Sequence, residues 1–212
     1  MAVKANHDIS SGLDTAFINS AINSNLAYRP EFVSNDYTQG KKVSVAIERE
    51  LRHCDAFYIS VAFITEGGLA PLKQVLAELR DKGIPGKILT TSYLTFTEPK
   101  ALKTLADLSN VEVRVYDSTD EGASGFHTKG YIFKEEEIYR FIVGSSNMTA
   151  SAFSVNKEWN TKLVSTSDGE LLKQMMTEFN ALWNSKHTLA VKDFIEDYEV
   201  RYRLIKEQKK NA

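Results

Sequence analysis

Between residues 56 and 116 the chain alternates short apolar runs with amphipathic patterns, and this alternation constrains the fold more than any other feature. The apolar runs are rich in β-branched and aromatic residues and predict buried strands, while leucines at steps of three and four predict helices between them. The predicted strands are 56–64, 87–91 and 111–116, and the predicted helices are 69–79 and 99–108. Strand, helix, strand, helix, strand is typical of a parallel sheet with crossover helices. We therefore predict an α/β fold, an α-β-α sandwich with a mixed, mostly parallel central sheet.

After residue 116 the pattern changes. Residues 117–125 are polar and contain two glycines, which predicts a flexible loop that could act as a lid. Two strands joined by an exposed turn follow, then another strand and two amphipathic helices. We expect the strands at 127–133, 138–143 and 159–165, helices at 11–23 and 40–53, a helix opened by a capping box at 167–170, and a final helix at 191–205.

The chain has 212 residues, of which 42% are hydrophobic and 25% are charged. This is enough apolar material for one globular domain with a buried core. We place that domain at residues 40–186, after an N-terminal helical extension at 1–39. Residues 187–212 form the C-terminal amphipathic helix, whose apolar stripe needs a cover from this domain, from a second copy or from a further domain to which the helix would be a linker.

The formal net charge of −2 gives no long-range attraction to phosphate, so contact with nucleic acid has to come from local basic side chains. The candidates for such contacts are Lys87, Arg140, Lys157 and Lys162.

No apolar run reaches membrane-spanning length, the first residues lack the core of a signal peptide, and a single cysteine fits a reducing compartment. We therefore expect a cytoplasmic protein that does not bind membranes. Cys54 is interpreted as a packed side chain. Its neighbours His53 and Asp55 are adjacent in sequence and do not converge on one ion, so no metal site or other cofactor is expected.

The sequence His127-Thr128-Lys129 lies in a predicted strand, where side chains two residues apart leave the same face. One face therefore presents an imidazole beside an ammonium. Cleaving a phosphodiester without a metal requires a nucleophile, a proton donor, and fixed positive charge and hydrogen-bond donors around the phosphorus. His127 can be the nucleophile and Lys129 the positive charge.

Polar residues that could complete such a site follow at 144–147 and at 158–160. Gly144 allows a close approach of the backbone to a phosphate, and the segment after it is expected to open a short helix with an anion-binding N-terminus. Glu158 and Asn160 share a face of the predicted strand, and a carboxylate near His127 would fix the imidazole tautomer. The candidate catalytic residues are His127, Lys129, Asn147 and Glu158, and the candidate substrate-binding residues are Ser145, Ser146 and Asn160.

The motifs His127-x-Lys129, Gly144-Ser145-Ser146-Asn147 and Glu158 closely resemble the signature of the phospholipase D superfamily, and in particular its single-motif nucleases, which act as homodimers. The resemblance covers about residues 40–186. It is widest to the module at the N-terminus of bacterial superfamily 2 DEAD/DEAH-type helicases and to metal-independent restriction endonucleases. It implies a phospholipase D-like sandwich in which 40–186 is the catalytic domain.

The resemblance also implies roles for the site residues. His127 would attack phosphorus to give a phosphohistidine, and His127 of the other subunit would protonate the leaving group. Lys129 and Asn147 would bind the phosphate with help from Ser145, and Glu158 would orient the imidazole. Two histidines in different protonation states predict a bell-shaped pH profile. The family often has an aspartate where this chain has Lys134.

Three functions remain open from the sequence. The first is a metal-independent phosphodiesterase or nuclease, with DNA favoured over lipid because lipid cleavage would require two motifs in one chain and an apolar interfacial surface. The second is a non-catalytic module that binds nucleic acid within a larger helicase or restriction protein. The third is a dimerisation scaffold for such a protein.

Overall fold

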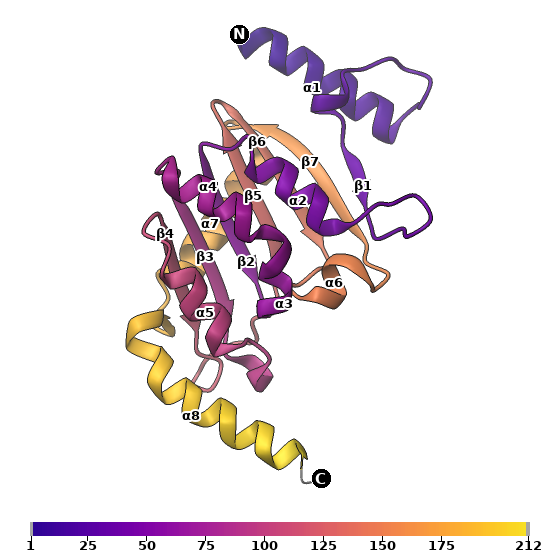
Figure 1. Cartoon of the computed structure of the whole chain (residues 1–212). Coiled ribbons are helices and arrows are strands. Elements are labelled where there is room, and N and C mark those ends of the chain that lie inside the picture. The colour runs from indigo at the N-terminus through magenta and orange to yellow at the C-terminus, as the bar shows by residue number, and fades with distance from the viewer. Residues whose placement is uncertain (1, 211–212) are drawn as a thin grey trace.

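An eight-stranded sheet with helices against both faces is the centre of the computed structural model, which describes residues 2–210 (Figure 1). The order of strands across the sheet is β1-β7-β6-β5-β2-β3-β4-β8. The strands are β1 (Glu31–Val33), β2 (Ala56–Val61), β3 (Gly86–Thr91), β4 (Val111–Tyr116), β5 (Lys129–Glu135), β6 (Ile138–Gly144), β7 (Asn160–Thr166) and β8 (Thr188–Ala190).

The prediction of a mixed sheet is confirmed, but the prediction that it is mostly parallel is wrong. Among the described strands only the β2–β3 and β3–β4 pairs are parallel, and the other five neighbouring pairs are antiparallel. The crossover helices enforce parallel pairing only from β2 to β4. The loop after β4 stays at the edge of the sheet where β4 ends, so β5 enters from that edge and runs opposite to β2. Short connections then keep β6 and β7 antiparallel.

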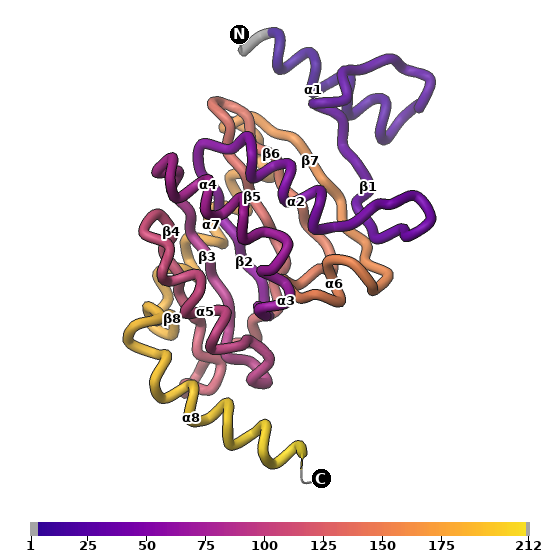
Figure 2. The backbone as a smooth tube through the Cα atoms, viewed as in Figure 1, coloured from indigo at the N-terminus to yellow at the C-terminus, as the bar shows by residue number. Residues whose placement is uncertain are grey.

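The helices form two layers, as predicted for an α-β-α sandwich (Figures 1 and 2). The helices are α1 (Ala2–Phe17), α2 (Val43–Leu51), α3 (Glu66–Leu69), α4 (Lys73–Asp81), α5 (Pro99–Ala106), α6 (Ala150–Ser154), α7 (Glu170–Trp183) and α8 (Val191–Lys210), with short 3-10 turns at Leu26–Tyr28, Ala70–Leu72 and Tyr93–Thr95. Helices α2 to α6 bury their apolar side chains against one face of the sheet, and α7 covers the other face. Among residues 2–210, no helix combines the length and apolar character needed to cross a membrane.

The two ends of the chain differ in part from the expected elements. The first helix begins and ends earlier than predicted, and the segment before residue 40 is not helical throughout, because β1 pairs with β7. The expected capping box does not form, since Gly169 is the N-cap of α7 without a side-chain hydrogen bond. The apolar stripe of α8 packs on this domain, and Tyr198 Oη donates to the carbonyl oxygen of Thr97 at 2.7 Å. The division into three segments stays a prediction.

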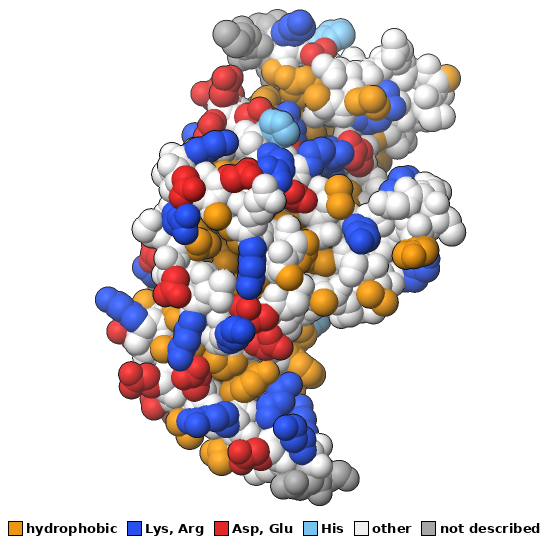
Figure 3. All heavy atoms as spheres, in the orientation of Figure 1, with side chains coloured by type: hydrophobic (Ala, Val, Ile, Leu, Met, Phe, Trp, Pro, Cys, Tyr) orange, Lys and Arg blue, Asp and Glu red, His pale blue; other side chains and the backbone are white. Residues whose placement is uncertain are grey.

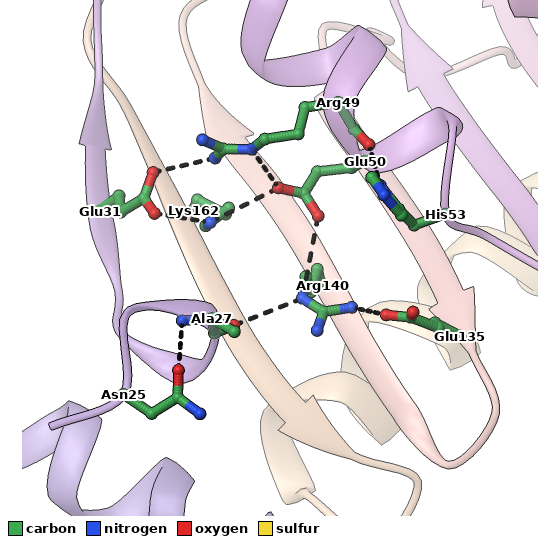
Figure 4. A network of polar contacts seen from close by, with 9 residues as sticks. All are labelled: Asn25, Ala27, Glu31, Arg49, Glu50, His53, Glu135, Arg140 and Lys162. Carbon is green, nitrogen blue, oxygen red and sulfur yellow. Dashed lines mark hydrogen bonds and ion pairs between the residues drawn. The ribbon is translucent and has the colours of Figure 1, made fainter.

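A network of six charged side chains joins β1, α2, β5, β6 and β7 (Figure 4). Lys162 lies 2.8 Å from Glu31 and 3.4 Å from Glu50, and both Lys162 and Glu50 are buried. Arg140 adds ion pairs to Glu135 and Glu50, and Arg49 adds ion pairs to Glu31 and Glu50. We call these six residues the ion network. It attaches the edge strand β1 to the rest of the sheet.

Candidate active site

The candidate residues converge on one edge of the sheet, where β2 and β6 end and β5 and β7 begin. Val61 pairs with Lys129, and Gly144 pairs with Asn160. The β5–β6 register, with Gly130 opposite Val143, places Lys129 beside Gly144. Antiparallel pairing therefore brings together segments that are far apart in the sequence, from Val61 to Asn160.

His127 and Lys129 contact each other, in agreement with the prediction that they share a face. Lys129 Nζ lies 2.8 Å from His127 Nδ1 and donates to the carbonyl oxygen of His127 at 2.9 Å. β5 begins at Lys129, so His127 is in the extended segment just before the strand, and its imidazole is exposed. The Phe63 ring lies edge-on to the imidazole, with 5.8 Å between ring centroids. An accessible imidazole thus lies between an ammonium and an aromatic ring.

Glu158 is buried and contacts the two serines of the 144–147 segment. Its Oε2 accepts a hydrogen bond from Ser145 Oγ and another from Ser146 Oγ at 3.3 Å. The backbone N–H of Trp159 donates to Ser145 Oγ at 3.1 Å. No hydrogen bond joins Glu158 to His127 within the described part of the chain. Glu158 therefore positions the serines here, and its expected action on an imidazole stays a prediction.

Asn160 connects residues 144–147, which we call the serine segment, to the edge strand β1. Its Oδ1 accepts from the backbone N–H of Ser146 at 3.2 Å, and its Nδ2 donates to Ser146 Oγ at 2.9 Å and to the carbonyl oxygen of Val33 at 3.1 Å. Glu158 and Asn160 thus share a face, as predicted. Asn160 and Ser146 are fully buried and use their polar atoms on each other, so they hold the serine segment in place, and their expected contact with substrate stays a prediction.

The serine segment also bonds to the end of β2, which fixes Asn147. The backbone N–H of Phe63 donates to Asn147 Oδ1 at 3.1 Å, so the NH₂ end of this amide is its free hydrogen-bond donor. Gly144 is required by packing, since an added Cβ would lie 2.2 Å from the carbonyl oxygen of Trp159. The short helix expected after Gly144 begins only at Ala150, and its N-terminus is capped by the Thr149 hydroxyl.

The Glu158 carboxylate influences two ionisable neighbours. Partial burial lowers the pKa of Lys129, and the charge of Glu158 opposes this effect. Full burial raises the pKa of Tyr131 well above its ordinary value, and Glu158 adds to that rise. Tyr131 Oη donates to the carbonyl oxygen of Ser146 at 3.0 Å. The fixed charges of the site are therefore one ammonium and one carboxylate.

Sequence reasoning missed the residues that build the rim of the site. Phe96 packs edge-on against Phe63, with 5.0 Å between ring centroids. It follows a turn in which Leu94 and Thr95 adopt φ of 53° and 57°, a backbone conformation that is unusual for such side chains. Tyr131 could have been found, because strand alternation places it on the face of Lys129. The turn at 93–96 had no signal in the sequence.

The loop after β4 is anchored at two points. Ser92 Oγ donates to Asp117 Oδ1 at 2.7 Å. Further along the loop, His187 Nδ1 lies 2.6 Å from Asp120 Oδ2. The sequence predicted the loop but could not predict these anchors, because both partners come from distant segments. The flexibility of the loop at residues 117–125 stays a prediction.

Three of the four cations predicted to contact nucleic acid are used inside the protein. Lys162 and Arg140 belong to the ion network, and Lys87 lies over the ring of Trp183, 5.2 Å from its centroid. The sequence could not show these contacts, because alternation along a strand shows the face but not what covers it. Only Lys157 is exposed and forms no ion pair with another described residue.

Lys134, which stands where the family often has aspartate, lies five positions along β5 from Lys129, roughly 17 Å away. It is therefore remote from the imidazole. Within residues 2–210 there is no cluster of three or more His, Cys, Asp or Glu side chains that could hold a metal ion.

Comparison with known proteins identifies a family model that matches this chain and solved structures that share its fold. Residues 53–183 match the family model described as "Cardiolipin synthase, PLD-like domain". Similar solved structures include NucT from Helicobacter pylori, with 14% identity and a TM-score of 0.58, and Nuc from Salmonella typhimurium, a phospholipase D family member, with 16% identity and a TM-score of 0.56. Both alignments cover 76% of this chain and 98% of the other.

Phosphatidylserine synthase from Haemophilus influenzae is also similar, with 15% identity and a TM-score of 0.56 over 86% of this chain and 45% of the synthase. At such identities the likeness shows the fold alone. A comparison with curated protein sequences found no match. Because the family model spans more than half of the sequence, and the fold agrees with it, this chain belongs to the phospholipase D-like family.

Proposed function

We propose that this protein is a phosphodiester hydrolase that cleaves DNA without a metal ion, through a phosphohistidine formed on His127. The observation that carries the proposal is the contact between the exposed imidazole of His127 and the Lys129 ammonium at 2.8 Å. It puts a nucleophile and a phosphate-binding charge at one point. Asn147, in the serine segment fixed by Glu158 and Asn160, adds an amide donor beside that point.

In the proposed reaction an imidazole nitrogen of His127 attacks phosphorus, and a P–N bond replaces the P–O bond to the leaving group. Lys129 and the Asn147 amide hold the non-bridging oxygens, whose charge grows in the transition state. The leaving oxygen takes a proton from a second histidine. Water then attacks phosphorus, gives its proton to that second histidine and releases His127.

The second histidine is proposed to be His127 of a second copy, because no other histidine of the chain belongs to the site described above. In such a homodimer, the Glu158 carboxylate, which does not bond His127 within its own chain, is available to orient the imidazole of the partner. An inactive His127→Ala chain mixed in excess with wild type should then suppress turnover by forming inactive heterodimers. Activity that follows the amount of wild-type chain alone would argue against a shared site.

DNA is proposed as the substrate because the motifs occur once and resemble those of the single-motif nucleases. The family description and the Haemophilus synthase name lipid reactions, so the fold itself does not select a substrate. A cytoplasmic location and a helicase or restriction partner are part of the same proposal. The partner is proposed from the sequence resemblance, and the location from the single cysteine, which fits a reducing compartment.

A second candidate is a module that binds nucleic acid without cleaving it. The observation that favours it is the burial of Ser146 and Asn160, both predicted to bind substrate. Fewer free donors are then left to stabilise the charge that develops on a phosphate in the transition state.

Cleavage of bis(p-nitrophenyl) phosphate and of labelled single- and double-stranded DNA in EDTA separates these candidates. The comparison is between wild type, His127→Ala and Lys129→Ala, with Lys82→Gln as an exposed lysine control remote from the site. Hydrolysis that survives chelation and is lost in the first two variants supports the histidine mechanism. No hydrolysis by wild type, together with DNA binding that Lys129→Ala weakens, supports the binding module.

A further inference from the structure

Two aromatic side chains are exposed together where β1 and β7 meet. Phe32 is 63% exposed and Trp159 is 75% exposed. Their rings stand edge to face, with 5.8 Å between centroids and an interplanar angle of 87°. Single exposed apolar residues are common on proteins, but two large rings that contact each other and leave most of their surface in water form a patch. The two rings are nearly perpendicular, so the patch offers the flat face of one ring and the edge of the other to solvent.

The aromatic pair is next to the candidate active site. Trp159 directly follows Glu158, and its backbone N–H donates to Ser145 Oγ. Phe32 pairs with Thr161 across the β1–β7 ladder. Neighbouring strands lie about 4.8 Å apart, so Phe32 is on a strand about 10 Å from the end of β6, where the serine segment begins. Strand alternation places Trp159 and Phe32 on the face of the sheet opposite Glu158 and Asn160, so a strand with one phosphate in the site would have to turn over the edge of the sheet to reach the aromatic pair.

A groove of about 460 Å³ along the outer side of β1 continues from Phe32. It is lined by Glu31, Arg49, Lys41 and Lys42 among others, which makes one acidic and three basic side chains. Glu31 is already paired with Lys162 and Arg49, and Lys41 and Lys42 form no ion pair with another described residue. Acidic and basic side chains are mixed over the face that Figure 3 shows, whereas the lining of this groove has more basic than acidic side chains.

A single-stranded nucleic acid fits the combination of exposed aromatic rings and a groove with basic side chains. Proteins that bind single strands join a positive groove, which follows the backbone, to aromatic rings on which bases stack. A duplex would keep its bases stacked on each other and away from the rings. A second copy of the chain would bury the aromatic rings but would have to cover unpaired lysines.

We propose that Phe32 and Trp159 form a stacking platform for bases of a single-stranded nucleic acid, with Lys41 and Lys42 binding phosphates beside them. The proposal names the substrate class of the function proposed above and rests on that function. It makes the strand leave the active site over Trp159 and Phe32 toward the groove.

The two tryptophans of the chain provide a direct test, since Trp159 is exposed and Trp183 is 2% exposed. Titration of His127→Ala protein with oligothymidylate in EDTA should quench Trp159 fluorescence, and the quenching should vanish in the Trp159→Phe variant. Quenching that persists in that variant would overturn the assignment. Because this experiment measures binding, it can succeed or fail independently of turnover by wild type.

Affinity for labelled oligothymidylate should fall about 5- to 150-fold in Phe32→Ala, the range expected when one base no longer stacks on a ring, and Phe32→Tyr should restore it. Phe17→Ala is the matched control, since Phe17 is equally exposed but lies in α1. Lys41→Gln with Lys42→Gln should lower the slope of log affinity against log salt by about 0.7 for each phosphate that the protein no longer binds.

Three outcomes would overturn the platform. One is unchanged single-strand affinity in Phe32→Ala and in Trp159→Ala. Another is an equal decrease of affinity in Phe17→Ala. The third is a change of oligomeric state in sedimentation without a change of affinity, which would assign the aromatic pair to an interface between copies. Failure of wild type to hydrolyse phosphodiesters, with binding as described, would leave the platform standing and remove only the catalytic function.

Discussion

Replacing Lys162 by methionine should destabilise the fold strongly, because it breaks the buried centre of the ion network. Lys162 is 3% exposed, with its ammonium 2.8 Å from Glu31 Oε1 and 3.4 Å from Glu50 Oε1. Removing one partner of a buried pair typically costs about 3–5 kcal/mol, because the other charge stays buried without compensation. Glu50 still forms an ion pair with Arg49 at 3.2 Å, so we expect Lys162→Met to lower the free energy of unfolding by about 3 kcal/mol.

The Glu50→Gln variant should cost about 2–3 kcal/mol for the same reason, since Glu31 still pairs with Lys162. The double variant removes one charge of each sign, and its destabilisation should be at least about 1.5 kcal/mol smaller than the sum of the two single variants. At about 2–4 °C per kcal/mol for a chain of this size, Lys162→Met should lower the Tm by roughly 6–12 °C.

The network also predicts how acid affects stability. Burial alone would raise the pKa of Glu31, but hydrogen bonds and charges from Lys162 and Arg49 lower it below 4.5. A carboxylate with a depressed pKa contributes stability above its unfolded pKa and loses it as the pH falls through the folded value. The Glu31 contribution is therefore present above about pH 4.5 and is lost below it, and Lys162→Met should reduce that loss.

Urea unfolding of the four proteins at pH 7, repeated at pH 4, measures both effects. Lys103→Met is the control, because Lys103 pairs with Glu199 on the exposed surface and should cost less than about 1 kcal/mol. Additive destabilisation in the double variant, or a Lys162→Met effect no larger than that of the control, would refute the reasoning.

Three further predictions concern the site and the core. Glu158→Gln removes the charge that raises the Lys129 pKa against burial, so the Lys129 pKa should fall further in an NMR titration of the lysine side chain. A Lys129 pKa equal to that of wild type would contradict this. Gly144→Ala should lower the free energy of unfolding by about 2–4 kcal/mol and abolish turnover, because the added Cβ would lie 2.2 Å from a backbone oxygen. Gly125→Ala is the control, because no heavy atom lies within 4 Å of a Cβ added there, and this variant should unfold in urea like wild type. Burial raises the pKa of the Cys54 thiol to about 12, so a disulfide reagent at pH 8 should label it only after unfolding, and fast labelling of native protein would disprove its packing.

The sequence predicts the parts of this fold that depend on local periodicity. The strands and helices between residues 56 and 116 are correct to within a few residues, because each has a clear apolar pattern and a turn signal at its end. The direction of β5 could not be predicted in this way. It depends on which edge of the sheet the loop after β4 follows, and that is set by distant anchors such as His187 and Ser92.

The same distinction holds for the site. Alternation along a strand correctly placed Lys129 with His127 and Glu158 with Asn160, because it depends only on spacing of two. It could not show that Ser146 and Asn160 bond to each other, or that Lys162 is covered by α2, since both depend on how separate elements pack. A charged residue in a strand can equally face solvent or a buried partner.

The central claim is that phosphorus becomes covalently bound to His127, and a rapid-quench experiment with bis(p-nitrophenyl) phosphate in EDTA tests it most directly. The phosphohistidine mechanism predicts a burst of p-nitrophenolate, together with an adduct that is stable in base, labile in acid and located by mass spectrometry on the peptide that contains His127. Lys82→Gln should form the same adduct, and His127→Ala should form none. Hydrolysis by wild type without a burst or an adduct on His127 would contradict this mechanism, because water would then attack phosphorus directly.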